Sequence, residues 1–481
     1  MRERWRRIGD EALLAAGAVG ERLGEAFAPS LRLGVTGLSR SGKTVFLATL
    51  VHNLVHGGRL PLFAPYAEGR LSSAGLAPQP DDEVPRFPYE DHVRALVDDR
   101  VWPRSTHKIA QLRVTIEYES ARVFSRRFGA GKLHLDLVDY PGEWLLDLPL
   151  MHLDYRQWSR EAMEEAARRP ADAAPFRAAL EGIDPEAPAR EADAQRLAEA
   201  FTRYLKDARA DPNALASLPP GRFLMPGDME GSPALTFAPL PLTTEEAAQG
   251  SLHAMMERRY ESYKTHVVKP FFKDHFARLD RQIVLVDVLA ALNGGPQALD
   301  ELRRALRAVL ACFRTGKMSF LGALVDRRIQ KILFVATKAD HIHHADHDRL
   351  ERILRHLVAE AIDAAEFAGA EVDVMAMAAV RATREASVTR GGETYLTIAG
   401  TPMEGQKIGD RVFDGIKEVG LFPGDLPDDP RAVFEAPRDE YGVTTLRFRP
   451  GKIETEGALT LSLPHIRLDR VLQYLIGDRL Q

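Results

Sequence analysis

Short, nearly continuous apolar runs recur along the chain, and most of them precede a stretch with helical periodicity. Such runs are typical of strands that are buried on both faces of a parallel sheet. The pattern predicts strands at 31–37, 110–118, 133–138, 282–292, 332–335 and 371–377, and helices at 43–55, 296–313 and 348–368. The alternation of the two patterns predicts an α/β fold with a mainly parallel central sheet.

Three regions depart from this alternation and divide the chain into predicted domains. Residues 1–28 predict a basic amphipathic helix, which either lies on an anionic membrane surface or packs against the core. Residues 145–275 carry helical runs broken by prolines, which predicts a helical insertion. Residues 391–481 show short alternating runs between Pro-Gly turns and a closing helix, which predicts a small α+β domain. The core is then expected to be discontinuous, at 29–144 and 276–390.

Composition and charge are those of an ordinary globular protein of 481 residues. The chain is 45% hydrophobic and 28% charged, and its net charge of −5 gives no reason to expect nucleic-acid binding. A single cysteine excludes an intramolecular disulfide, and no secretory signal is recognisable, which together favour the cytoplasm. No stretch approaches the roughly 20 apolar residues that a membrane-spanning helix needs.

The junction between the first strand and its helix carries the clearest chemistry. Its sequence, GLSRSGKT, matches G-x-x-x-x-G-K-[ST], the P-loop pattern, with the required strand before it and helix after it. Backbone N–H groups of such a turn bind phosphate oxygens, the lysine places positive charge on the terminal phosphates, and the threonine hydroxyl suits Mg²⁺. The residues expected to bind nucleotide here are Gly37, Ser39, Arg40, Ser41, Gly42, Lys43, Thr44 and Val45.

A second candidate turn, DYPG, follows the apolar strand that ends at Asp139. A carboxylate at the end of a strand beside the P-loop is suited to hold Mg²⁺ through water, and the Gly142 N–H can approach the γ-phosphate. Loss of that contact on hydrolysis would release the turn, which is the physical basis of a nucleotide switch. We therefore expect Thr44 and Asp139 at the metal and Gly142 at the nucleotide.

A third candidate turn contains Thr337, Lys338 and Asp340, a T-K-x-D sequence after an apolar strand. The Asp340 carboxylate can accept hydrogen bonds from the N1–H and the exocyclic amine of guanine, whereas adenine has no N1–H. The alkyl stem of Lys338 can cover the face of the base. After the last strand, Ala379 and Val380 are expected to offer a backbone N–H to the guanine O6.

Two further positions are open to more than one interpretation. The segment 57–104 is rich in proline and glycine, so we expect it to be irregular, and a first switch would lie in this part of the chain. Ser105 and Thr106, directly before the strand 110–118, are the candidate first-switch hydroxyls, although a solvated loop explains them equally well.

Asp287 lies within the predicted strand 282–292, and a buried partner or strand-end position is favoured over catalysis.

The sequence HIHHADHD is dense enough in histidine to suggest a transition-metal site. It directly follows the third turn and precedes a predicted helix, so a polar loop and helix cap is the favoured interpretation. The histidines concerned are His341, His343, His344 and His347.

Taken in order, GLSRSGKT, DYPG and TKAD resemble the Ras-like GTPases. With the long insertion, QIVLVDVL, KADHIHH and the closing LPHIRLDRVLQYLIGDRL, the whole chain resembles the YcjX-like family of bacterial P-loop proteins. The resemblance implies a cytosolic, stress-associated GTP-binding protein. It carries the phosphate role to 37–44, the magnesium and switch role to Asp139 and Gly142, and the base role to Lys338 and Asp340.

Two positions differ from related enzymes. Glu143 follows the switch glycine, where a Ras-like enzyme carries a glutamine that orients water, so slow hydrolysis is expected. Arg40 occupies the P-loop position where potassium-stimulated GTPases place asparagine, so its guanidinium either serves as an arginine finger in cis or points away. The catalytic candidates are therefore Lys43, Arg40 and Glu143.

The sequence as a whole predicts a GTP/GDP-binding switch that uses Mg²⁺ and moves its helical insertion. An ATPase is one alternative, since T-K-x-D restricts the base less than N-K-x-D. A scaffold that binds nucleotide without hydrolysis is another. The expected partners are a protein effector at the insertion or the C-terminal domain and, through residues 1–28, a membrane surface; no nucleic acid is expected.

Overall fold

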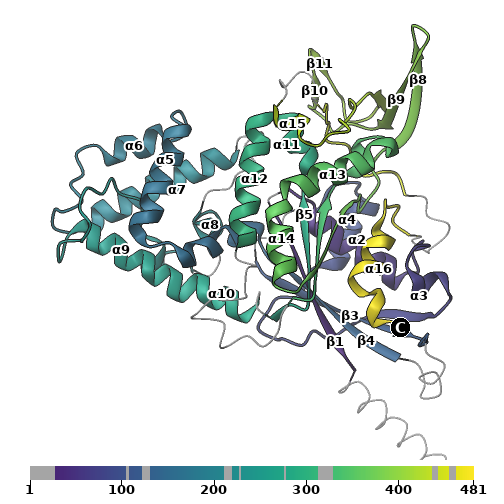
Figure 1. Ribbon diagram of the computed structural model, residues 1–481, viewed down its shortest axis with the longest axis horizontal. Coiled ribbons are helices and arrows are strands. Elements are labelled where there is room, and N and C mark those ends of the chain that lie inside the picture. The colour runs from purple at the N-terminus through teal and green to yellow at the C-terminus, as the bar shows by residue number, and fades with distance from the viewer. Residues whose placement is uncertain are drawn as a thin grey trace, which may run out of the picture.

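The computed structural model centres on a seven-stranded sheet with helices on both faces (Figure 1). The structure describes residues 28–38, 40–104, 108–121, 131–210, 219–226, 229–275, 278–311, 329–435, 443–453 and 462–481. The predicted first helix, at 1–28, therefore lies almost wholly outside the described residues. None of the helices in the described ranges combines the length and the apolar character that crossing a bilayer requires.

The sheet has the strand order β2-β3-β4-β1-β5-β6-β7. Strands β4, β1, β5, β6 and β7 are parallel, while β3 pairs antiparallel with β4 and β2 pairs antiparallel with β3. This mostly parallel sheet confirms the predicted α/β fold class. The strands are β1 Ser30–Gly37, β2 Leu71–Ala77, β3 Ala110–Tyr118, β4 Gly131–Asp139, β5 Arg281–Val286, β6 Lys331–Ala336 and β7 Glu371–Ala376.

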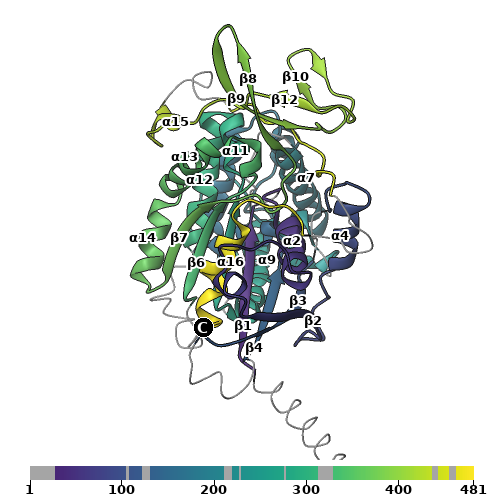
Figure 2. The same ribbon diagram turned by 90° about the vertical axis from the view of Figure 1, so that its right-hand side faces the viewer.

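Helices bury both faces of the sheet, because successive apolar residues of each central strand point to opposite sides. In β5, Ile283 and Leu285 pack towards one group of helices, whereas Val284 and Val286 pack towards the other. Figure 2 looks onto the first face, which is covered by α2 (Lys43–Val55), α4 (Tyr89–Val97) and α16 (Leu468–Ile476). The second face is covered by α11 (Val288–Gly294), α12 (Pro296–Ala311), α13 (His347–Leu357) and α14 (Ala359–Phe367).

The chain between β4 and β5 forms a helical lobe to one side of the sheet (Figure 1). Buried aromatic rings fill this lobe, with Trp158 stacked on Tyr260 at a centroid distance of 5.1 Å and edge-on to Phe237 at 5.3 Å. The lobe shares one hydrophobic core with the second face of the sheet. Its elements are the 3-10 segment η2 (Gly142–His152), α5 (Tyr155–Arg168), α6 (Ala174–Leu180), α7 (Glu191–Ala210), α8 (Gly221–Leu224), the short 3-10 turn η4 (Pro233–Leu235), α9 (Leu252–Tyr263), the π-helical turn η5 (Lys264–Val268) and α10 (Lys269–Asp274).

After β7 the chain builds two small sheets above the core (Figures 1 and 2). One has the order β12-β9-β8, and its β8–β9 hairpin projects from the molecule; the other pairs β10 with β11. The strands are β8 (Arg384–Arg390), β9 (Glu393–Gly400), β10 (Lys407–Ile408), β11 (Arg411–Val412) and β12 (Val419–Leu421), followed by the short helix α15 (Ala432–Glu435).

Several elements differ from the sequence-based prediction. The segment 57–104 is not irregular throughout, because it forms α3 (Ala64–Ala67), the edge strand β2 and α4. The predicted strand 282–292 ends at Val286, since Asp287 caps a helix there: its Oδ1 accepts from the Ala290 N–H at 3.1 Å.

Two observations bear on the expected C-terminal region. Its predicted start, at residue 391, falls inside the β8–β9 hairpin. The closing helix α16 does not pack with the small sheets, because Val471, Leu472 and Leu475 are fully buried against the first face of the central sheet.

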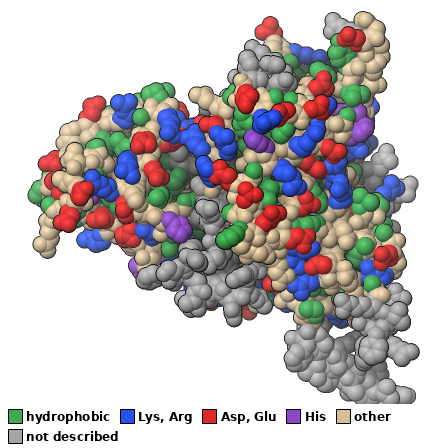
Figure 3. Space-filling model, in the orientation of Figure 1, with side chains coloured by type: hydrophobic (Ala, Val, Ile, Leu, Met, Phe, Trp, Pro, Cys, Tyr) green, Lys and Arg blue, Asp and Glu red, His purple; other side chains and the backbone are tan. Residues whose placement is uncertain are grey.

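Over the surface seen in Figure 3, acidic and basic side chains are interspersed on the helical lobe and on the core alike.

Candidate nucleotide-binding site

The three predicted turns leave the sheet at one edge. The parallel register aligns Val35 with Asp139, Gly37 with Leu285, and the end of β5 with the end of β6. The loops that follow β1, β4, β5, β6 and β7 therefore emerge side by side at the carboxyl ends of the strands. In open α/β sheets this edge is where ligands bind.

The turn after β1 is compact and depends on glycine. Gly42 has φ 89° and precedes the first residue of α2, a left-handed conformation that favours glycine. A Cβ at Gly37 would lie 2.5 Å from the Leu285 carbonyl oxygen, so this position has no space for a side chain. The Lys43 ammonium donates to the Gly37 carbonyl at 3.1 Å, which joins the two ends of the turn. The geometry is that of a P-loop.

The other residues of this turn are found in different environments. Ser41 and Thr44 are buried, and Val45 is half-buried against the core of the first face. Arg40 is exposed and has φ 65°, so the turn presents it to solvent. Ser39 lies outside the described residues.

The turn after β4 touches the P-loop. A Cβ at Gly142 would lie 2.0 Å from the Gly37 carbonyl oxygen and 3.1 Å from the Lys43 ammonium. Only glycine allows this approach, since any side chain would push the two turns apart. Asp139, at the end of β4, is 1% exposed and lies in the same region. The structure thus brings the first two predicted turns into direct contact.

A buried hydrogen-bond chain supports the second turn from beneath. Gln282 of β5 donates through its Nε2 to the Thr36 hydroxyl at 2.8 Å and to the Tyr140 hydroxyl at 3.1 Å. Thr36 in turn donates to the Ile283 carbonyl at 2.8 Å. Burial raises the pKa of Tyr140 far above its ordinary value, so the phenol stays protonated and remains a donor or acceptor in this chain.

The segment after Gly142 is fastened to the helical lobe by one carboxylate. Asp147, in η2, accepts from the Gly221 N–H at 2.6 Å, from the Arg222 N–H at 3.3 Å and from the Tyr263 hydroxyl at 2.6 Å. Burial raises the pKa of Asp147 to about 6, and these hydrogen bonds oppose the shift. Five residues beyond Gly142, the chain is therefore tied to α8 and to the end of α9. Glu143 is the second residue of η2, and its side chain is outside what the structure describes.

The third turn is organised around Lys338, which has φ 62°. Its ammonium forms an ion pair with Asp287, the residue that caps α11 at the end of β5. Thr337 donates from its N–H to the Val286 carbonyl at 2.9 Å. Asp287 is therefore a strand-end partner, as the sequence favoured, and it holds the lysine of the T-K-x-D turn.

Asp340 is buried in the same turn, at 4% exposure. Its Oδ2 accepts from the Ala382 N–H at 2.8 Å, and its main-chain carbonyl accepts from the Thr383 hydroxyl. The loop after β7, which carries Ala379 and Val380, therefore lies against this turn. The structure therefore places the two segments that carry the candidate base-recognition residues side by side.

The C-terminal strap, residues 462–467, links these parts and was not anticipated. Ala378 and Ile466 exchange backbone hydrogen bonds, at 2.8 and 3.1 Å. The Asn53 side chain, in α2, donates to the Leu463 carbonyl at 3.1 Å and accepts from its N–H at 2.9 Å. The strap thus connects the helix that follows the P-loop to the loop beside Asp340. Ser105 and Thr106, the candidate first-switch hydroxyls, lie outside the described residues.

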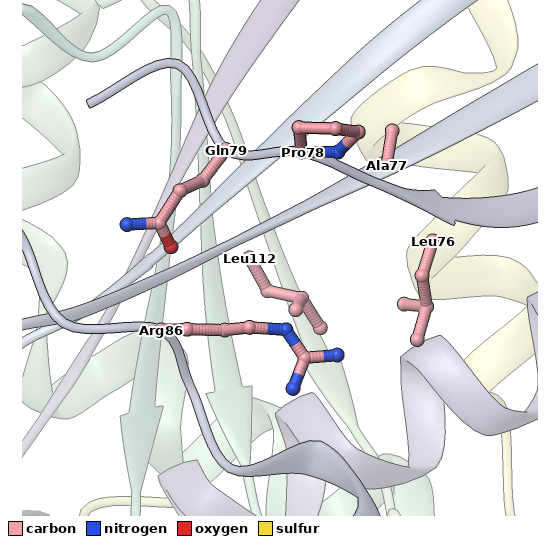
Figure 4. Close-up of a pocket in the computed structure, with 6 residues that line it drawn as sticks. All are labelled: Leu76, Ala77, Pro78, Gln79, Arg86 and Leu112. Carbon is pink, nitrogen blue, oxygen red and sulfur yellow. The ribbon is translucent and has the colours of Figure 1, made fainter. Parts of the chain in front are cut away.

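Two cavities lie elsewhere, and neither lining includes a described residue of the three turns. One, of about 340 Å³, lies where η2, α5, α7 and α12 meet, with Leu146, Trp158 and Phe201 among its walls. The other, of about 260 Å³, opens at the edge strand β2. Figure 4 shows its lining residues, Leu76, Ala77, Pro78, Gln79, Arg86 and Leu112.

Comparison with known proteins agrees with this arrangement. A model of the YcjX-like family matches residues 31–480. The chain is 38% identical over 464 residues to the Ras-like GTPase YcjX of Escherichia coli, an alignment that covers 94% of this chain and 96% of that protein. It is 35% identical over 474 residues to the Ras-like GTPase YcjX of Shewanella oneidensis, covering 94% of this chain and 95% of that protein.

Proposed function

This chain belongs to the YcjX-like family, and from that premise we propose that it binds GTP with Mg²⁺, hydrolyses it slowly and passes the nucleotide state to its helical lobe. The observation that carries the proposal is the contact between the P-loop and the switch turn. Gly142 lies against the Gly37 carbonyl and beside Lys43, where a terminal phosphate would meet both turns. The names of the curated relatives support GTP as the nucleotide.

The residues present fit both parts of the ligand. Thr44 and Asp139 supply hard oxygen donors from two touching turns, the ligand type that Mg²⁺ prefers. Bound there, Mg²⁺ would neutralise charge on the phosphates. At the other end of the site, Asp340 supplies the carboxylate that would recognise guanine, and Asp287 holds Lys338 beside it.

The structure also offers a route for coupling. A displacement of Gly142 would move η2, and Asp147 fastens η2 to the main chain of α8 and to Tyr263. The helices of the lobe would then respond to the γ-phosphate, and an effector could read them. We further propose a cytoplasmic, stress-related regulatory role, with a protein effector at the helical lobe or in 391–481, and a peripheral membrane contact through residues 1–28.

The decisive experiment is competition of ATP and GTP for a bound fluorescent guanine nucleotide, followed by measurement of phosphate release. Selective displacement by GTP and slow release of phosphate support the proposal. Equal displacement by ATP would instead favour an ATPase. Nucleotide binding without phosphate release, even with candidate partners, would favour a scaffold.

In the same assay, Lys43→Ala is expected to weaken nucleotide binding by about 2 kcal/mol, or about 30-fold, because a charge-assisted contact to phosphate is lost. The control is Lys206→Ala, an exposed lysine on α7. Unchanged affinity in the Lys43 variant would show that this turn does not bind phosphate.

A cis arginine finger at Arg40 makes a separate prediction. Single-turnover GTP hydrolysis by Arg40→Ala is expected to fall at least about tenfold, because the guanidinium would stabilise transition-state charge on the phosphates. Nucleotide affinity should change little. Arg203→Ala, another exposed arginine, is the control. A wild-type rate in the Arg40 variant eliminates the finger role.

A further inference from the structure

The histidine run after the third turn divides into two groups with different surroundings. The His347 Nε2 donates to the Ala339 carbonyl at 2.9 Å, and the His341 ring lies edge-on to Phe448 at 5.4 Å. These two rings therefore already have partners within the fold. His343 and His344 instead lie together, with ring centroids 4.3 Å apart, and both face β8.

Glu385, the second residue of β8, completes this second group. Its Oε2 lies 2.9 Å from the His344 Nδ1 and 3.9 Å from the His343 Nε2. The His344 N–H also donates to Glu385 Oε1 at 3.3 Å, which fixes the carboxylate beside the two rings. Two imidazoles and one carboxylate therefore converge from two elements that are more than 40 positions apart in the chain.

We propose that His343, His344 and Glu385 bind a transition-metal ion of the zinc class. Imidazole nitrogen with carboxylate oxygen is a donor set for such ions. One ligand atom from each residue can be chosen so that all lie within 4.8 Å of one another. In a tetrahedral site the ligand atoms are roughly 3.3 Å apart, so the longest of these separations would have to shorten by about 1.5 Å.

The side chains differ in how much they must move. His343 is 9% exposed and is held in place, whereas the His344 side chain is 65% exposed and can turn towards the ion. That exposure leaves a fourth coordination position for water. Ligation through the His343 Nε2 requires its proton to shift to Nδ1, which gives up a 3.3 Å hydrogen bond from the Ala345 N–H.

The position of the site gives the ion a structural role. His343 follows Asp340 by three residues, and Glu385 follows Thr383 by two; Thr383 already bonds the Asp340 carbonyl. A bound ion would cross-link these same two segments, the loop that follows Asp340 and the start of β8. The inference does not rest on nucleotide binding, because none of the three ligands belongs to the predicted nucleotide site.

The test is Zn²⁺ binding by the full chain, with any affinity tag removed, after chelator treatment and in excess Mg²⁺ so that the predicted magnesium site is occupied. Calorimetric titration is expected to show one Zn²⁺ per chain, and Co²⁺ should give the absorption of a tetrahedral centre. Glu385→Gln and His344→Ala should each weaken Zn²⁺ binding at least about tenfold. His356→Ala, an exposed histidine on α13, is the matched control.

Thermal melting of the metal-free variants checks that they fold, and His344 is exposed enough for its loss to be tolerated. The proposal is overturned by the absence of saturable binding in the wild type. It is equally overturned if Glu385→Gln and His344→Ala bind Zn²⁺ as tightly as the wild type, or if His356→Ala weakens binding as much as they do.

Discussion

Replacement of Gly142 by alanine is expected to reduce GTP hydrolysis at least about 100-fold, since displacement of reacting groups by an ångström has an effect of that size. The added Cβ would lie 2.0 Å from the Gly37 carbonyl oxygen, which is main chain and has no rotamer to change. The P-loop and the turn that carries Gly142 must therefore separate by at least about an ångström. Single-turnover hydrolysis, with nucleotide affinity measured alongside, checks the prediction.

Gly75→Ala is the control for this substitution, because a Cβ there meets nothing within 4 Å. Circular dichroism and thermal melting should show that both variants remain folded. Wild-type hydrolysis by Gly142→Ala would mean that the contact between the two turns has no part in the chemistry.

The α/β core was predictable because its signals are local. Each buried strand is a short apolar run, and each motif combines a strand, a turn and a helix within about a dozen residues. The strand 110–118 coincides with β3, and the helix 43–55 coincides with α2. The parallel register of β1, β4, β5, β6 and β7 then brings the carboxyl ends of these five strands to one edge of the sheet.

The features that could not be predicted from the sequence depend on contacts between residues that are far apart in the chain. Asp287 lies in an apolar run, and its partnership with Lys338, 51 positions away, is visible only in the fold. A signal was present, since an aspartate before a helix-forming run is an N-cap pattern. The partnership of Asn53 with Leu463 spans 410 positions, and local sequence carries no sign of it.

The edge strand β2 illustrates a different limit. Its sequence, LSSAGLA, is rich in small residues and lacks the alternation of a half-buried strand, so propensity alone predicts a loop. It becomes a strand because β3 offers a free edge, and the two pair from Leu71 to Ala77. Where the local conformational preference of a segment is weak, pairing with a neighbouring strand thus determines its secondary structure.

The second large effect concerns stability. Asp147→Ala is expected to lower the free energy of unfolding by about 4 kcal/mol, because the N–H groups of Gly221 and Arg222 and the Tyr263 hydroxyl lose a buried acceptor. Chemical denaturation measures this loss. Asp207→Ala, an exposed aspartate on α7, is the control and should stay within about 0.5 kcal/mol of the wild type.

The pH dependence of this loss identifies its cause. Burial raises the pKa of Asp147 from an ordinary 3.8 to about 6, so the folded state holds its proton more tightly than the unfolded state does. Its contribution to stability is then fully present below pH 3.8 and is lost as the pH rises through about 6. The difference in the free energy of unfolding between wild type and Asp147→Ala should therefore be about 1 kcal/mol larger at about pH 5 than at about pH 7.5. If this difference instead increases as the pH rises, the ionised carboxylate is the form that stabilises the lobe, through the hydrogen bonds from its three donors.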